Sequence, residues 1–155
     1  MPTTPEEFNA KVIDEFRTTK GRVGGMFEGT PLLLLHHAGA KSGVSRVNPV
    51  AYLPDDRGYL IWAANGGAPN NPSWYHNLKA HPNTRIEVGS ETIEVGSETI
   101  EVGSETIDVV AEEATGTERE RLFAKAADRY PQLHDLAHKT DRVIPMIVLT
   151  LRRST

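Results

Sequence analysis

The sequence has no cysteine, which excludes disulfides, thiolate metal sites and cysteine nucleophiles, and favours a protein of the reducing cytoplasm. It also has no apolar run near the roughly 20 residues that a membrane-spanning helix needs. The longest such run, residues 59–64, has the length of a strand. The first seven residues lack the basic and apolar regions of a secretory signal. We therefore expect a cytoplasmic protein.

An excess of positive charge is absent as well. The formal net charge is −4, which argues against nucleic-acid binding, because that function needs a basic surface. Residues 36–49 nevertheless carry Lys41, Arg46 and two histidines without a single carboxylate. This local positive window predicts an anionic small-molecule ligand.

The 155 residues fit one domain, 1–155, with a hydrophobic core of its own. Apolar spacing and turn residues predict helices and antiparallel strands, so we expect a mainly β domain with flanking helices, an α+β fold built as a small barrel. The predicted elements are a helix within residues 1–21, strands at 32–36, 46–53 and 59–64, a short helix capped by Asn71, a hairpin region at 86–106, a strand at 107–111, a helix from 117, a helical turn at 134–139 and a strand at 144–151.

Residues 86–106 repeat the heptapeptide Ile-Glu-Val-Gly-Ser-Glu-Thr three times. One continuous strand is excluded, because an odd period would send successive isoleucines to opposite faces. Turns at each Gly-Ser instead predict pairs between Ile86 and Ile93, Ile93 and Ile100, and Ile100 and Ile107. Two extra units restore the chain direction, so this tandem hairpin insertion still delivers strand 107–111 to the barrel as a single hairpin would.

Three segments have residue types that suit a bound coenzyme. The loop at 39–49 offers cations and backbone N–H groups for a phosphate or carboxylate, although a solvated turn is the alternative interpretation. Small residues at 63–67 permit a planar ring to approach the backbone, or mark a simple turn. A short helix at 71–79 presents its N-terminus to an anion. Within it, Trp74 is equally consistent with a core position.

The histidines do not predict a metal site. His134 and His138 have the spacing of a two-histidine zinc helix, but their segment is short and no third ligand is evident. His36 and His37 are adjacent in a strand, so their side chains point to opposite faces and do not readily share one metal ion. We expect no metal.

Taken together, the ordered motifs resemble the deazaflavin-dependent nitroreductase family, coenzyme F-420-dependent reductases of split β-barrel fold related to FMN-binding split barrels. The resemblance runs from about residue 24 to 151. It rests on five motifs in order: Gly24-Gly25-Met26-Phe27, the loop 39–49, Ala63-Ala64-Asn65-Gly66-Gly67-Ala68, the segment 71–80 from Asn-Pro-Ser-Trp-Tyr onwards, and Thr140-Asp141-Arg142-Val143-Ile144-Pro145.

The resemblance implies coenzyme F-420 as the hydride donor, and a small quinone, nitroaromatic or activated enone as the acceptor. It implies that the phosphate and tail are held by Ala40, Lys41, Ser42, Arg46, Val47, Asn48 and Pro49. It implies that the ring region is flanked by Ala63, Ala64, Asn65, Gly66, Gly67, Ser73, Trp74, Tyr75, Asn77 and Lys79. FMN or heme, and coenzyme binding without turnover, remain the alternatives.

The substrate side departs from the family. Relatives carry tyrosines before the Thr-Asp-Arg motif, whereas this chain keeps Tyr130 but has Leu133 and Leu136 where further tyrosines are expected. Tyr130 and His134 are the predicted catalytic residues, with His134 as the candidate proton donor. We expect a monomer or homodimer. The acidic N-terminal helix disfavours the alternative of a peripheral position at a membrane.

Overall fold

The computed structural model describes residues 5–18, 32–64, 70–89, 91–95, 98–102, 105–140 and 142–152. The helices are α1 (Pro5–Thr18), α2 (Ser73–Ala80), α3 (Gly116–Arg129) and α4 (Gln132–Lys139). The strands are β1 (Leu32–Ala38), β2 (Ser45–Ala51), β3 (Leu53–Asp55), β4 (Gly58–Trp62), β5 (Asn83–Val88), β6 (Glu91–Val95), β7 (Glu98–Val102), β8 (Glu105–Glu113) and β9 (Met146–Leu151).

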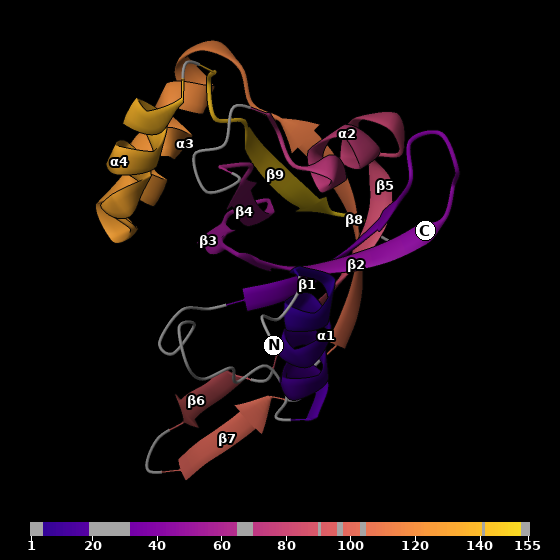
Figure 1. The fold of residues 1–155 in the computed structure, drawn as a ribbon. Helices are drawn as coiled ribbons and strands as arrows, with labels where there is room; N and C mark the ends of the chain where they lie inside the picture. The colour runs from indigo at the N-terminus through magenta and orange to yellow at the C-terminus, as the bar shows by residue number, and fades with distance from the viewer. Residues whose placement is uncertain are drawn as a thin grey trace.

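Seven strands form one curled antiparallel sheet in the order β2-β1-β5-β8-β9-β4-β3. The two outer strands of this order, β2 and β3, leave the curl open as a half-barrel, which confirms the predicted α+β split-barrel architecture. Figure 1 shows α2 near one end of the curled sheet, α1 beside β1 and β2, and the α3–α4 pair at a separate corner. No helix of the described part of the chain is long and apolar enough to cross a membrane.

Strand β1 explains how one run of leucines serves two cores. Alternate side chains of a strand point to opposite faces. Leu33 and Leu35 accordingly join the cluster inside the curl, whereas Leu32 and Leu34 pack against the apolar side of α1. All four side chains are buried. The same alternation separates the two histidines that follow, so His36 lies on the α1 side and His37 on the inner side.

The repeat pairs differently from the prediction at two of three places. Ile93 lies opposite Ile100 in a separate two-stranded sheet of β6 and β7, as predicted. Ile86, however, lies opposite Ile107, so the predicted Ile86–Ile93 and Ile100–Ile107 pairs are wrong. The reason is burial: β8 pairs with β5 on one side and β9 on the other, within the main core. The predicted delivery of strand 107–111 is confirmed, and β6–β7 extends away from the main sheet (Figure 1).

Helix α2 begins one residue later than a cap at Asn71 would require. Its N-cap is Pro72, and no side chain caps the helix. The carboxamide oxygen of Asn71 instead accepts a hydrogen bond from Arg142 at 2.7 Å. The cap prediction was wrong because a distant guanidinium, which sequence spacing does not reveal, takes the acceptor that a cap would use.

Candidate coenzyme site

A pocket of about 1040 Å³ lies where α1, the β1–β2 hairpin and the start of α2 meet, and we call it the α1–α2 pocket. Nine of the predicted coenzyme residues line it: Ala40, Lys41, Ser42, Arg46, Val47, Asn48, Ser73, Trp74 and Asn77. Of the other lining residues, Gly39, Asn71 and Pro72 belong to the two segments that the sequence singled out. Sequence reasoning did not select Asn9, Ala10, Ile13 and His37 as coenzyme residues. The pocket thus joins two predicted segments, 39–49 and 71–79, that are separated in the chain by β3 and β4.

The β1–β2 loop owes its shape to two glycines. Gly43 has a φ of 70°, a left-handed conformation that side chains rarely adopt. Gly39 closes the loop by donating to the carbonyl of Val44 at 2.9 Å and accepting from Gly43 N at 2.8 Å. A β-carbon at Gly39 would collide with the hydroxyl of Ser42. The loop conformation therefore favours glycine at position 43, whereas a side chain at position 39 would force the Ser42 hydroxyl to rotate away from its present place.

Lys41 and Arg46 give the pocket its positive charge. Both side chains are exposed, and neither has a carboxylate partner within the described residues. Several other cations do have a carboxylate partner, as Arg17 has in Glu87 at 2.7 Å. Two cations without carboxylate partners on one loop form a site at which an anion gains charge-assisted hydrogen bonds.

Buried polar side chains form the inner wall of the pocket. His37 and Asn77 are only 4% and 7% exposed. Asn77 Oδ1 accepts from the backbone N–H of Ala40 at 2.9 Å, and Asn77 Nδ2 lies 2.9 Å from His37 Nδ1. His37 Nε2 in turn lies 2.7 Å from Asn48 Oδ1. These bonds tie the loop at 39–49, which we call the anion loop, to β1 and α2.

Trp74 is both a core residue and a residue of the pocket wall, the two roles that the sequence left open. It is 8% exposed and belongs to the core cluster inside the curl, yet it also lines the α1–α2 pocket. A buried indole at a pocket wall offers a flat apolar surface held by its packing.

Five predicted coenzyme residues of the described part lie outside the α1–α2 pocket lining: Pro49, Ala63 and Ala64, together with Tyr75 and Lys79, which line a second pocket. Pro49 sits within β2 opposite Leu34. Ala63 and Ala64 follow β4 and are nearly inaccessible. Their predicted neighbours Asn65, Gly66 and Gly67, like the motif at 24–27, lie outside the described residues.

Arg142 has a structural role near the α1–α2 pocket that the sequence did not predict. The motif that contains it contributed only to the family resemblance. Its guanidinium donates to the carbonyls of Ala63 and Ala64 at 3.0 and 2.7 Å and to Asn71 Oδ1. Ala63 N also donates to the carbonyl of Pro145 at 3.1 Å. Arg142 therefore links the end of β4 to the segment just before α2. This role is visible only in the structure, because the contacting residues are more than 70 positions apart in the sequence.

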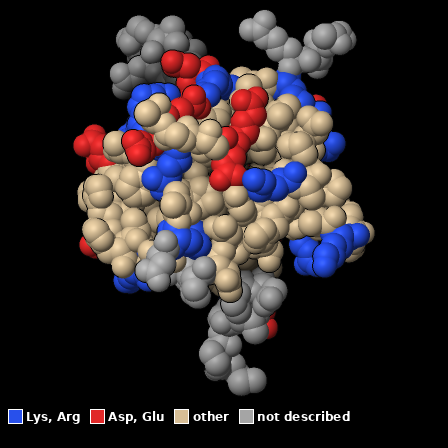
Figure 2. Space-filling view, turned by 90° about the horizontal axis from the view of Figure 1, so that it is seen from above, with Lys and Arg blue, Asp and Glu red and all other residues tan. Residues whose placement is uncertain are grey.

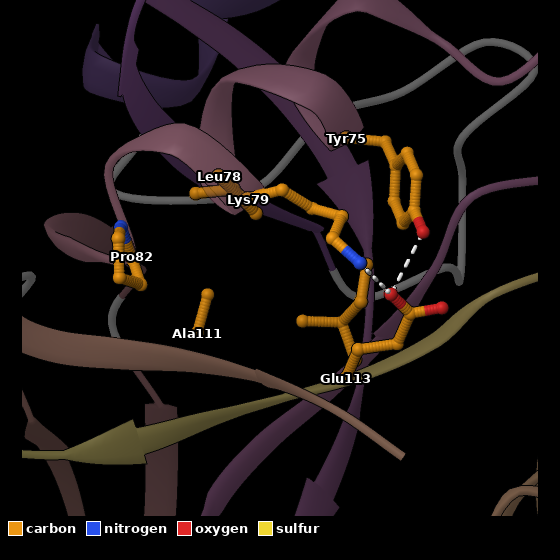
Figure 3. A pocket seen from close by; sticks show the side chains of 7 residues that line it. Tyr75, Leu78, Lys79, Pro82, Ala111 and Glu113 are labelled. Atoms are coloured by element: carbon orange, nitrogen blue, oxygen red, sulfur yellow. Dashed lines mark hydrogen bonds and ion pairs between the residues drawn. The ribbon is translucent and has the colours of Figure 1, made fainter. Parts of the chain in front are cut away.

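Tyr75 and Lys79, both predicted at the coenzyme, line a different pocket of about 300 Å³ that shares no lining residue with the first. Figure 3 shows both side chains pointing toward Glu113 of β8. Tyr75 donates to Glu113 Oε1 at 2.7 Å, and Lys79 Nζ donates to the same oxygen at 3.1 Å. Burial and the hydrogen bond to Glu113 raise the pKa of Tyr75, so it is protonated at neutral pH.

The predicted catalytic pair lies at the α3–α4 corner. Tyr130 is 6% exposed and packs against Trp62, with ring centroids 5.3 Å apart. Burial raises its pKa, and its hydroxyl has no hydrogen-bond partner within the described residues. His134 is exposed, with its ring 5.9 Å from that of Phe123. Neither residue lines the α1–α2 pocket, and their catalytic role stays a prediction.

Among the described residues, no group of three or more histidine, aspartate or glutamate side chains is placed to hold a metal ion. The donor set of the α1–α2 pocket, with two cations and carboxamides, instead suits the phosphate and carboxylate groups of an organic anion. The residues present therefore fit the acidic tail that the resemblance implies.

Comparison with known proteins identifies one family and several relatives. The family model described as F420H(2)-dependent quinone reductase matches residues 10–101 and 96–151, and the two matches overlap within the repeat. An F420H(2)-dependent quinone reductase of Mycobacterium tuberculosis is 48% identical over 75 residues, covering 48% of this chain and 50% of the relative. The chain thus aligns with about half the length of that relative. A second M. tuberculosis protein, provisionally named with the same activity, is 33% identical over 132 residues, which are 84% of this chain and 99% of the relative.

Solved structures agree with the fold. An F420-H2 dependent reductase has a TM-score of 0.57 and 32% identity, covering 77% of this chain and 93% of that protein. A protein described as a domain-swapped dimer has a TM-score of 0.59 and 30% identity, covering 94% of this chain and 99% of that protein. With the family model matched along most of its length, the chain belongs to the F420H(2)-dependent quinone reductase family.

Proposed function

We propose that the chain is an F420H2-dependent reductase that binds its coenzyme in the α1–α2 pocket and reduces a small quinone. Nitroaromatics and activated enones are further proposed acceptors, because each, like a quinone, contains an electron-poor conjugated group that a hydride can reduce. The observation that carries the proposal is a pair of cations, Lys41 and Arg46, that have no carboxylate partner among the described residues and lie on the wall of a large pocket. Family membership supplies the identity of the anion that they would bind.

The protein residues contribute binding and orientation, while the bound coenzyme supplies the hydride. Lys41 and Arg46 hold the phosphate and acidic tail, and the glycine turn brings Ser42 alongside them. Trp74 and Ser73 border the coenzyme from α2. Ala63 to Gly67 stay the proposed ring-flanking segment, of which the first two residues are held by Arg142.

The proposed partner is a small-molecule acceptor, in a protein that acts in the cytoplasm as a monomer or homodimer. The similarity to a protein described as a domain-swapped dimer favours the homodimer. Basic side chains lie dispersed among acidic and uncharged ones on the face shown in Figure 2, which supports a small anionic ligand over nucleic acid.

Titration of the protein with coenzyme F-420, followed by coenzyme fluorescence, tests the proposal. We expect micromolar or tighter binding, weakened by about 10- to 100-fold in Arg46→Ala or Lys41→Ala, because each charged hydrogen bond contributes about 1.5 to 3 kcal/mol. Arg85→Ala is the matched control: Arg85 is an exposed arginine that lines neither pocket, so its removal should leave the dissociation constant unchanged.

The same experiment separates the alternatives. A correctly folded protein that fails to bind coenzyme F-420 would contradict the proposal. FMN or heme absorbance in the purified protein would favour the corresponding coenzyme. Tight binding of reduced coenzyme without oxidation by menadione or a nitroaromatic would make the chain a coenzyme-binding protein without turnover.

A further inference from the structure

The three hydrogen bonds that connect Ala40, Asn77, His37 and Asn48 form a chain in which each donor and acceptor can be assigned from the chemistry of the groups. A backbone N–H only donates, so the N–H of Ala40 requires the oxygen of the Asn77 carboxamide, 2.9 Å away. The amide nitrogen of Asn77 then faces His37 Nδ1 at 2.9 Å and donates to it. Because Nδ1 accepts, the imidazole is neutral and carries its proton on Nε2.

The last bond of this chain reaches the pocket. His37 Nε2–H donates to Asn48 Oδ1 at 2.7 Å, which occupies the carboxamide oxygen of Asn48. Asn48 lines the α1–α2 pocket, and its Nδ2 makes no hydrogen bond to the described residues. The two hydrogens of Nδ2 are therefore available to a ligand in the pocket.

We propose that His37 is a positioning residue that fixes the polarity of Asn48, so that the pocket presents N–H donors to an anionic ligand group. The inference rests on the proposed function for the identity of the ligand. If the Asn48 carboxamide turned over, its nitrogen would meet His37 Nε2–H, and two donors would face each other at a buried bond. The opposite tautomer of His37 would place a donor against Asn77 Nδ2. The backbone N–H of Ala40 thus determines the orientation of the Asn77 carboxamide, the tautomer of His37 and the orientation of the Asn48 carboxamide at the pocket.

The charge state of His37 agrees with this arrangement. Burial lowers its pKa, the hydrogen bond with Asn48 opposes that effect, and the neighbouring Arg46 of β2 and His36 of β1 lower the pKa further. From α2 it faces the uncharged Asn77, and the α1 residues of the pocket lining are Asn9, Ala10 and Ile13, which are also uncharged. A neutral imidazole is the form that the bond pattern needs.

A double-mutant cycle on coenzyme F-420 affinity tests the proposal, at pH 8 with protein whose fold is verified by circular dichroism. We expect Asn48→Ala and His37→Phe each to raise the dissociation constant about 10-fold, and the double variant to be no worse than either one. A purely structural role of His37 gives additive losses, which would overturn the proposal. An unchanged dissociation constant in folded His37→Phe would overturn it as well.

Asn48→Asp provides a second test if His37→Phe does not fold. The carboxylate still accepts from His37 but removes both donors, so we expect weaker binding than in Asn48→Ala. Binding as tight as in the unaltered protein would overturn the proposal. The imidazole ¹⁵N shifts of the ligand-free protein add a readout that needs no coenzyme. Protonation on Nε2 alone is expected, and protonation on Nδ1 would refute the bond directions. If the unaltered protein does not bind coenzyme F-420, the proposed function fails, while the ¹⁵N shifts still decide the tautomer.

Discussion

At the scale of single residues, Tyr130 combines a buried hydroxyl with the absence of a hydrogen-bond partner within the described residues. An unpaired buried polar group costs stability that an apolar side chain of the same shape does not. We therefore expect Tyr130→Phe to raise the free energy of unfolding by about 1 kcal/mol, measured by urea denaturation. The ring contact with Trp62 is kept in this variant.

The same variant tests the catalytic role predicted for Tyr130. Loss of a proton donor would lower kcat for menadione reduction without lowering stability. His134→Ala is the companion variant, since His134 is exposed and its removal leaves the core intact. A decrease in stability of Tyr130→Phe would contradict the expectation above and indicate that the hydroxyl has a partner outside the described residues.

At the scale of secondary-structure elements, the β5–β8 ladder is independent of the strands that interrupt it in the sequence. The ladder ends with Val88 opposite Glu105. Deletion of residues 89–102, two heptapeptide units, would join Val88 directly to Gly103-Ser104-Glu105. Two residues then connect a terminal pair, which is the length of a tight hairpin with glycine first. We expect this deletion to preserve the fold.

The deletion variant should keep the coenzyme dissociation constant within about twofold and should not lower the thermal midpoint, because a shorter loop costs less entropy to close. Coenzyme fluorescence and circular dichroism measure the two quantities. Loss of binding with the fold intact would mean that β6 and β7 contribute to the site. Deletion of residues 89–95 is the control, because it leaves one heptapeptide strand without its partner.

Local patterns predicted the anion loop, because cations, glycines and the absence of carboxylates all fall within residues 39–49. Local patterns also predicted the antiparallel strands of the sheet, because the alternation of apolar and polar residues and the turn residues are properties of short segments. They did not predict the α1 wall of the pocket, the hydrogen bond that Asn77 donates to His37, or the guanidinium of Arg142 between β4 and α2. Each of these depends on segments brought together by tertiary packing. The repeat pairing failed similarly: adjacent units suit each other, but burial in the main sheet favours the distant partner.

At the scale of the whole molecule, the charge balance makes coenzyme binding sensitive to salt. The chain has a net charge of −4, yet Lys41 and Arg46 stand exposed at one pocket. Screening shortens the reach of exposed charges from about 10 Å at 0.1 M salt to about 3 Å at 1 M. We expect the dissociation constant of coenzyme F-420 to rise several-fold between about 0.05 and 0.5 M sodium chloride.

Fluorescence titrations at both salt concentrations measure this dependence, with the Arg46→Ala and Arg85→Ala variants alongside. The dependence should be weaker in Arg46→Ala and unchanged in Arg85→Ala. A dissociation constant that is the same at both salt concentrations would show that uncharged contacts, such as those of Trp74 and Ser73, supply the affinity.

The pairing of β6 with β7 also restricts how the gene can change. Slippage during DNA replication adds or removes tandem copies one at a time, but each added heptapeptide contributes one strand. Because β5 and β8 are already satisfied in the main sheet, extra strands find partners only among themselves. One, three or five copies add an even number of extra strands and restore the chain direction toward β8, whereas two copies add a single strand without a partner and four end the chain at the wrong end of the added strands. Selection should therefore favour odd copy numbers among close relatives of this chain.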